Sequence, residues 1–135
     1  TEIDYGAWGG MSDGDIVARF GPTAARELDA WEKESRWPTE TVKWMPGAET
    51  VTRNLRNLTA ELTARLGTDE TALVCSSNGI LRYFLEFTPE GLAGHQMAGK
   101  AKMATGAASL LDVSDGETRV LFWNVKAGIQ LPDEI

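Results

Sequence analysis

The feature that most constrains the fold is an apolar run that stops abruptly at small polar residues. Residues 73–82 are Leu-Val-Cys-Ser-Ser-Asn-Gly-Ile-Leu-Arg. Residues 71–76 lack the alternation of a half-exposed strand, which predicts a short buried strand. Residues 78–87 continue with an amphipathic pattern typical of a helix. A buried strand that turns sharply into a helix predicts the α/β class, with a sheet flanked by helices.

The rest of the chain fits that class. A long helix is predicted over residues 49–66, where one apolar stripe follows the helical period: Val51, Leu55, Leu58, Leu62 and Leu66. Shorter helices are expected over residues 15–20 and 24–34, separated by Gly21-Pro22, and a brief helical turn over 92–98. Strands over residues 107–113 and 118–125 are joined by Ser-Asp-Gly-Glu, a strong hairpin signal. No linker or repeat divides the chain, so residues 1–135 are predicted to form a single domain.

Composition excludes several kinds of partner. The net charge is −7, so the chain offers no basic stripe for nucleic acid or for an anionic membrane surface. No apolar run approaches the length of a bilayer span. With one cysteine, Cys75, and one histidine, His95, neither an intrachain disulfide nor a Cys/His zinc cluster can form. A reducing cytoplasm is the expected location, and Cys75 is expected to be buried in the strand and inert.

Two stretches carry residues suited to chemistry. Ser76, Ser77 and Asn78 lie at the predicted strand-to-helix turn, where backbone N–H groups and hydroxyls can seat a phosphate. The alternative interpretation is an N-capped turn with no ligand. Glu2 lies beside a glycine-rich loop, where a carboxylate can act as a general acid or base. The alternative there is a solvated carboxylate near a terminus.

These two stretches resemble the motifs of the histidine phosphatase superfamily, the phosphoglycerate mutase-like enzymes. The first stretch matches the family pattern at Glu2, Asp4, Tyr5, Gly6 and Gly10. The second matches the family's Ser-His-Gly-Gly turn at Ser76, Gly79 and Arg82. It departs at Ser77, which stands where the family has histidine, and at Asn78, which stands where the family has glycine. The matches extend from Glu2 to about Asn124.

The resemblance implies a phosphohistidine mechanism on a phosphorylated small molecule, with no metal or organic cofactor. It assigns Glu2 as the proton donor to the leaving oxygen and places Ser77 at the catalytic histidine position. It also implies that Ser76 and Asn78 bind phosphate. A serine hydroxyl can donate a hydrogen bond but carries no positive charge, so phosphate binding is expected to survive better than turnover.

The family's nucleophile lies in an upstream Arg-His-Gly motif, which the 135 residues do not contain. His95 does not match its position. The chain is therefore expected to be the C-terminal part of a longer protein, incomplete at its N-terminus and inactive alone. A non-catalytic module that binds phosphate or protein stays open, as does an unrelated α/β binding domain. The partners expected are the substrate and either a second copy of the chain or the missing N-terminal segment.

Overall fold

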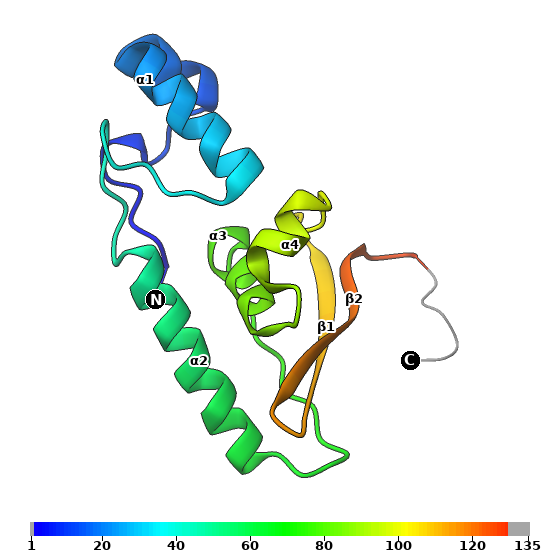
Figure 1. Ribbon diagram of the computed structural model, residues 1–135. Coiled ribbons are helices and arrows are strands. Elements are labelled where there is room, and N and C mark those ends of the chain that lie inside the picture. The colour runs from blue at the N-terminus through cyan, green and yellow to red at the C-terminus, as the bar shows by residue number, and fades with distance from the viewer. Residues whose placement is uncertain (1, 130–135) are drawn as a thin grey trace. The chain divides into compact units, whose positions relative to one another are not determined.

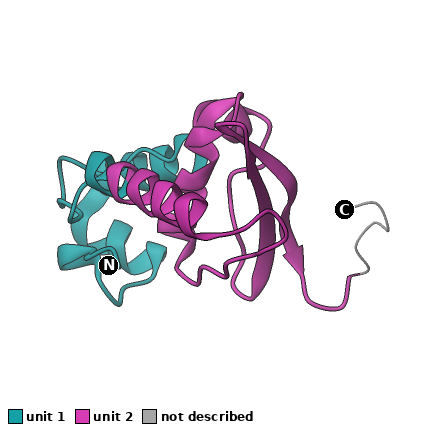
Figure 2. Ribbon diagram, turned by 90° about the horizontal axis from the view of Figure 1, so that it is seen from below, with its two compact units in different colours: residues 1–51 teal, residues 52–135 magenta. Residues whose placement is uncertain are grey.

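A computed structural model describes residues 2–129 of the chain. The residues group into two compact units, residues 1–51 and 52–135 (Figure 2). Figure 1 shows the order of the elements, with α2 beginning in the first unit and continuing in the second. Each unit is described below by itself. The prediction of a single domain over residues 1–135 stays a prediction.

The first unit contains α1 (Asp13–Glu34), which is broken at Gly21. Ser12 caps its start, because the Ser12 hydroxyl accepts a hydrogen bond from the Asp15 backbone N–H. Gly21 has φ of 79° and ψ of −160°, and Pro22 follows it. A glycine in that region interrupts the helical path at little steric cost. The predicted pair of helices, separated at Gly21-Pro22, is thus confirmed as two helical segments that meet at a kink.

An aromatic cluster forms the core of the first unit. Four rings lie around Trp44 with centroid distances of 4.9 to 6.0 Å and steep interplanar angles: Tyr5, Trp8, Trp31 and Trp37. Edge-to-face pairs of this kind are favoured by the aromatic quadrupole. The cluster joins residues from the N-terminal stretch, from α1 and from the loop that precedes α2.

The predicted long helix is confirmed as α2 (Ala48–Arg65). Val51 and Leu55, in its first half, are buried, whereas Leu62 and Leu66 are half-buried. The apolar stripe therefore exists as predicted, and its burial decreases toward the end of the helix.

The predicted helix over residues 78–87 is only partly correct. One α-helical turn, α3 (Asn78–Leu81), passes directly into a 3₁₀ helix, η2 (Arg82–Phe87). The burial is compatible with the tighter winding, because Ile80 and Tyr83 are buried three residues apart, and so are Arg82 and Leu85. Side chains three residues apart share a face in a 3₁₀ helix. The predicted short turn that follows is confirmed as α4 (Gly91–Met97).

The predicted hairpin is confirmed. Strands β1 (Ala107–Ser114) and β2 (Glu117–Lys126) pair antiparallel in a two-stranded sheet. Asp115 and Gly116 have φ of 53° and 77°. Two successive positive φ values are typical of a type I′ turn, whose twist suits a two-residue hairpin loop.

The predicted buried strand over residues 71–76 is wrong. Within residues 2–129, β1 and β2 are the strands, and they pair with each other. Residues 71–76 lie outside both, Leu73 is 89% exposed, and Cys75 is exposed rather than buried. A segment becomes a buried strand only when a neighbour pairs with its backbone and covers its side chains.

The α/β class is confirmed, with helices and a two-stranded antiparallel sheet. In the second unit η2 packs against β2, and Figure 1 shows α3, η2 and α4 gathered beside the hairpin. None of the helices formed by residues 2–129 has the length and hydrophobicity that crossing a membrane requires.

Candidate functional site

The N-terminal stretch, residues 2–8, is held against residue 45; we call it the acid loop. The Asp4 backbone N–H donates to the Met45 carbonyl and the Met45 N–H donates back to the Asp4 carbonyl, each at 3.0 Å. The Asp4 side chain also accepts a hydrogen bond of 2.9 Å from the Gly6 N–H. Ile3 is buried while Glu2 is exposed. Glu2 is therefore an exposed residue that lies two positions before a fixed point of the backbone.

Gly6 is required where the acid loop approaches the segment before α2. A Cβ on Gly6 would lie 2.9 Å from the Val42 Cγ2, and Gly6 has φ of 58°. Both the contact and the left-handed backbone disfavour any larger residue. Tyr5 and Trp8 flank this approach with their rings against Trp44.

In the second unit, residues 76–78 form the turn into α3, which we call the polar turn. Ser77 is the N-cap residue, with extended backbone angles, and its carbonyl accepts the N–H groups of Ile80 at 3.0 Å and Leu81 at 2.8 Å. The Ser77 Oγ is buried and has no hydrogen-bond partner among the described residues. Its hydroxyl makes no capping bond. A buried hydroxyl without a partner costs free energy, which a bound acceptor can recover.

Asn78 ties the polar turn to residues 102–104. The Asn78 Oδ1 accepts a hydrogen bond of 2.8 Å from the Met103 N–H. From β2, the Asn124 Oδ1 accepts from the Ala104 N–H at 2.7 Å and the Trp123 Nε1 donates to the Lys102 carbonyl at 3.1 Å. Three side chains from two elements thus hold one irregular segment beside the turn.

Arg82 is buried, with an exposed fraction of 2%. Its Nε donates a hydrogen bond of 3.3 Å to the Asn78 carbonyl. The guanidinium keeps its charge in any protein environment. The arginine of the matched motif therefore contacts the polar turn from inside the unit.

His95 is held by neighbouring polar groups. The Thr88 hydroxyl donates its single proton to the Leu85 carbonyl at 2.6 Å, so the 3.0 Å contact between Thr88 and the His95 Nε2 uses the histidine as donor. The Glu90 Oε2 lies 3.6 Å from the same nitrogen. A catalytic triad needs the acid on one imidazole nitrogen and the nucleophile on the other. This arrangement is therefore structural.

Sequence reasoning missed Glu27 on α1. Its carboxylate accepts the backbone N–H groups of Thr39 at 2.6 Å, Glu40 at 2.6 Å and Thr41 at 3.1 Å, and also the Thr41 hydroxyl. Burial raises the pKa of the Glu27 carboxyl, but these hydrogen bonds outweigh it and lower the pKa below its ordinary value. The only signal in the sequence was its spacing of four from Trp31, which places both on one face of α1.

The predicted site residues are distributed over both units. Ser76, Ser77 and Asn78 lie together in the polar turn of the second unit, and Glu2 lies in the acid loop of the first. Across residues 2–129 no three His, Cys, Asp or Glu side chains gather closely enough to hold a metal ion.

Comparison with known protein families shows a match to one family model. The model of the histidine phosphatase superfamily (branch 1) matches residues 1–126, which include the acid loop, the polar turn and both strands. No curated protein and no solved structure matches the chain.

Proposed function

Because the chain belongs to the histidine phosphatase superfamily, we propose that it acts on a phosphorylated small molecule by phosphoryl transfer. The resemblance found in the two motifs is confirmed by this membership. The observation that carries the proposal is the match over residues 1–126, a range that includes both motifs.

Glu2 is the proposed proton donor to the leaving oxygen. Its exposure supports this role, because a general acid must reach the substrate. The paired hydrogen bonds between Asp4 and Met45 also support it, since they fix the backbone from which Glu2 extends. A fixed donor loses less conformational entropy when the transition state forms.

The polar turn is the proposed phosphate-binding element. Ser76 and Asn78 bind phosphate oxygens, and Ser77, at the family's histidine position, donates a hydrogen bond from its Oγ. The buried Ser77 Oγ, which lacks a hydrogen-bond partner within residues 2–129, supports this assignment. The orientation of Asn78 does so too, because its amide oxygen is taken by Met103 and the donor group of an amide is the one that suits a phosphate.

The phosphorylated histidine is proposed to come from outside the 135 residues. The only histidine here is His95, whose Nε2 donates to Thr88. The chain alone is therefore proposed to be inactive, with turnover confined to a longer parent that supplies an Arg-His-Gly segment. We propose no metal and no organic cofactor for the reaction, and no nucleic-acid or membrane partner. A cytoplasmic location and association with that segment or with a second copy belong to the same proposal.

One observation favours a second candidate function. Ser77 is neutral where the family places histidine, and a neutral hydroxyl stabilises the charge of a transferring phosphoryl group less well. A pseudoenzyme that binds phosphate or protein without turnover would tolerate this substitution.

The decisive experiment measures the intact mass of the protein in its native cell, followed by hydrolysis of p-nitrophenyl phosphate. We expect a mass above 14.7 kDa and activity in the native protein but none in the 135-residue chain. Glu2→Gln in the native protein should abolish turnover, whereas the control Asp69→Asn should not. Robust turnover by the 135-residue chain would contradict the proposal.

A substitution at the polar turn separates the two functions. If the native protein is inactive and Ser77→His creates activity, it is a pseudoenzyme. If the native protein already turns over and the change alters only the rate, it is an enzyme with a variant pocket.

A further inference from the structure

Residues 42–45 contact the acid loop at three successive points. Val42 lies against Gly6, at a distance that leaves no room for a Cβ there. Trp44 packs edge-on against Tyr5, with ring centroids 4.9 Å apart. Met45 exchanges two backbone hydrogen bonds with Asp4. The position of the acid loop therefore depends on the position of residues 42–45.

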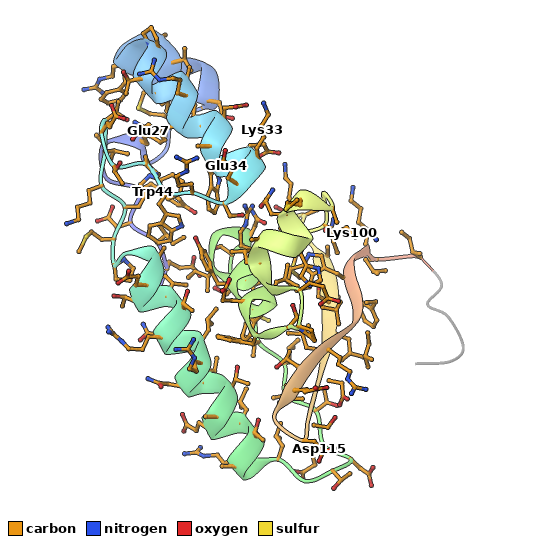
Figure 3. The ribbon with its side chains drawn as sticks, in the orientation of Figure 1. Glu27, Lys33, Glu34, Trp44, Lys100 and Asp115 are labelled. Atoms are coloured by element: carbon orange, nitrogen blue, oxygen red, sulfur yellow. The ribbon has the colours of Figure 1, made fainter. Side chains whose placement is uncertain are left out.

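The residues just before this segment are held by Glu27. Three consecutive backbone N–H groups, those of Thr39, Glu40 and Thr41, converge on its carboxylate, and the Thr41 hydroxyl adds a fourth hydrogen bond. Figure 3 labels Glu27 on α1 and Trp44 in the loop that follows. Hydrogen bonds to a charged acceptor are roughly twice as strong as neutral ones, so this is a strong polar contact between α1 and the loop.

A second contact from α1 supports the same segment. Trp31 lies one helical turn after Glu27, and its ring packs against Trp44 with centroids 5.2 Å apart. The carboxylate thus holds residues 39–41 while the indole holds residue 44. Together they fix both ends of a short stretch on one face of α1.

We propose that Glu27 is a positioning residue for the acid loop: it anchors residues 39–41 to α1, and through residues 42–45 it fixes the backbone that carries Glu2. This deepens the proposed function, on which it rests only for the chemistry of Glu2. The contacts from Glu27 through residues 39–45 to the acid loop all lie within the first unit, and they do not depend on the function of the loop.

The experiment measures amide hydrogen exchange by NMR in the full 135-residue chain and in Glu27→Gln. We expect the protection of the Asp4 and Met45 amides to fall about tenfold or more, which corresponds to about 1.4 kcal/mol, because glutamine is uncharged and has one acceptor oxygen in place of two. The β1–β2 amides in the second unit should keep their protection. The matched control is Asp29→Asn, which removes an exposed carboxylate two residues further along the same helix and should change none of these amides.

Two outcomes would overturn the proposal. In the first, the Thr39–Thr41 amides lose protection in Glu27→Gln while the Asp4 and Met45 amides stay protected. Glu27 would then hold residues 39–41 without affecting the acid loop. In the second, every amide in the chain loses protection equally, which would indicate general destabilisation. If Glu27→Gln fails to fold, Thr41→Val removes only the hydroxyl contact and should produce the same pattern at smaller amplitude. The measurement needs no turnover, so failure of the proposed enzymatic function leaves its result intact.

Discussion

The side-chain oxygen of Asn78 accepts a 2.8 Å hydrogen bond from the backbone N–H of Met103, twenty-five residues further along the chain. This bond joins the polar turn to residues 102–104, which β2 also holds through Asn124 and Trp123. The turn and the hairpin are thereby linked through one irregular segment. The geometry of Ser77 then depends on contacts distant in sequence.

Asn78→Ala should lower the free energy of unfolding by about 1 kcal/mol, because it leaves the Met103 N–H without its acceptor. Urea unfolding measures the effect. The matched control is Asn57→Ala on the exposed side of α2, which should be neutral or slightly stabilising because alanine favours the helix. Equal unfolding midpoints for Asn78→Ala and the wild type would refute the linkage.

Ser77→Ala and Ser109→Ala should move stability in different directions. The Ser77 hydroxyl is buried without a partner among the described residues, so its removal should leave the unfolding free energy unchanged or raise it. The Ser109 hydroxyl accepts the Asn124 N–H at 2.9 Å, so its removal should cost about 1 kcal/mol.

The same two variants test whether Ser77 binds phosphate. Inorganic phosphate is titrated into each variant, and binding is monitored by NMR. Binding should weaken in Ser77→Ala and persist in Ser109→Ala. A large loss of stability in Ser77→Ala would show that the hydroxyl serves the fold instead.

Acid should weaken the hydrogen bonds between the Glu27 carboxylate and residues 39–41. Burial raises the pKa of Glu27, but the hydrogen bonds from Thr41 and the neighbouring backbone lower it overall, and no nearby charge contributes to the shift. Because the folded-state pKa is depressed, the stabilisation is present at neutral pH and is lost as the pH falls through that lowered value.

Urea midpoints of the wild type and Glu27→Gln, measured from pH 7 downward, should therefore differ most near neutral pH and converge in acid. Asp29→Asn, which disturbs an exposed pair with Lys33, should differ from the wild type by less than about 1 kcal/mol throughout. If the difference in urea midpoint between the wild type and Glu27→Gln stays constant with pH, it does not come from the hydrogen bonds to the charged Glu27 carboxylate.

Gly116→Ala should lower the stability of the fold, whereas Gly14→Ala should raise it. Gly116 has φ of 77° in the hairpin turn, where a Cβ costs about 1 kcal/mol. Gly14 lies in the first turn of α1, where the nearest atom to an added Cβ is 3.9 Å away, so alanine should stabilise by about 0.5 kcal/mol. Thermal unfolding followed by circular dichroism distinguishes the two, and a stabilising Gly116→Ala would contradict the turn assignment.

Local patterns predicted local structure well. The Asp-Gly pair predicted the β1–β2 hairpin, because its positive φ values are a property of those two residues. The leucine stripe predicted α2, because helical periodicity lies within one segment. Residues 71–76 were predicted wrongly because a strand depends on a partner, which no pattern inside those residues supplies.

The candidate site could be read from the sequence only in part. Ser76–Asn78 were singled out because their small polar side chains interrupt an apolar run, and their role stays a prediction. The contact from Asn78 to Met103 spans too many residues to leave a local signature. The same holds for Glu27, whose hydrogen-bond donors lie twelve to fourteen residues away. Three of its four donors are backbone N–H groups, which every residue except proline carries, so the sequence of residues 39–41 gives little sign of the contact.

The ring cluster around Trp44 has an optical consequence. Four of the five tryptophans belong to it, and the fifth, Trp123, lies in β2. Indoles that are close and steeply inclined couple their electronic transitions, so near-ultraviolet circular dichroism should come mainly from residues 1–51. Replacing Trp123 with phenylalanine would leave a chain whose indole emission reports on that unit alone, and the two units could then be watched separately as they unfold.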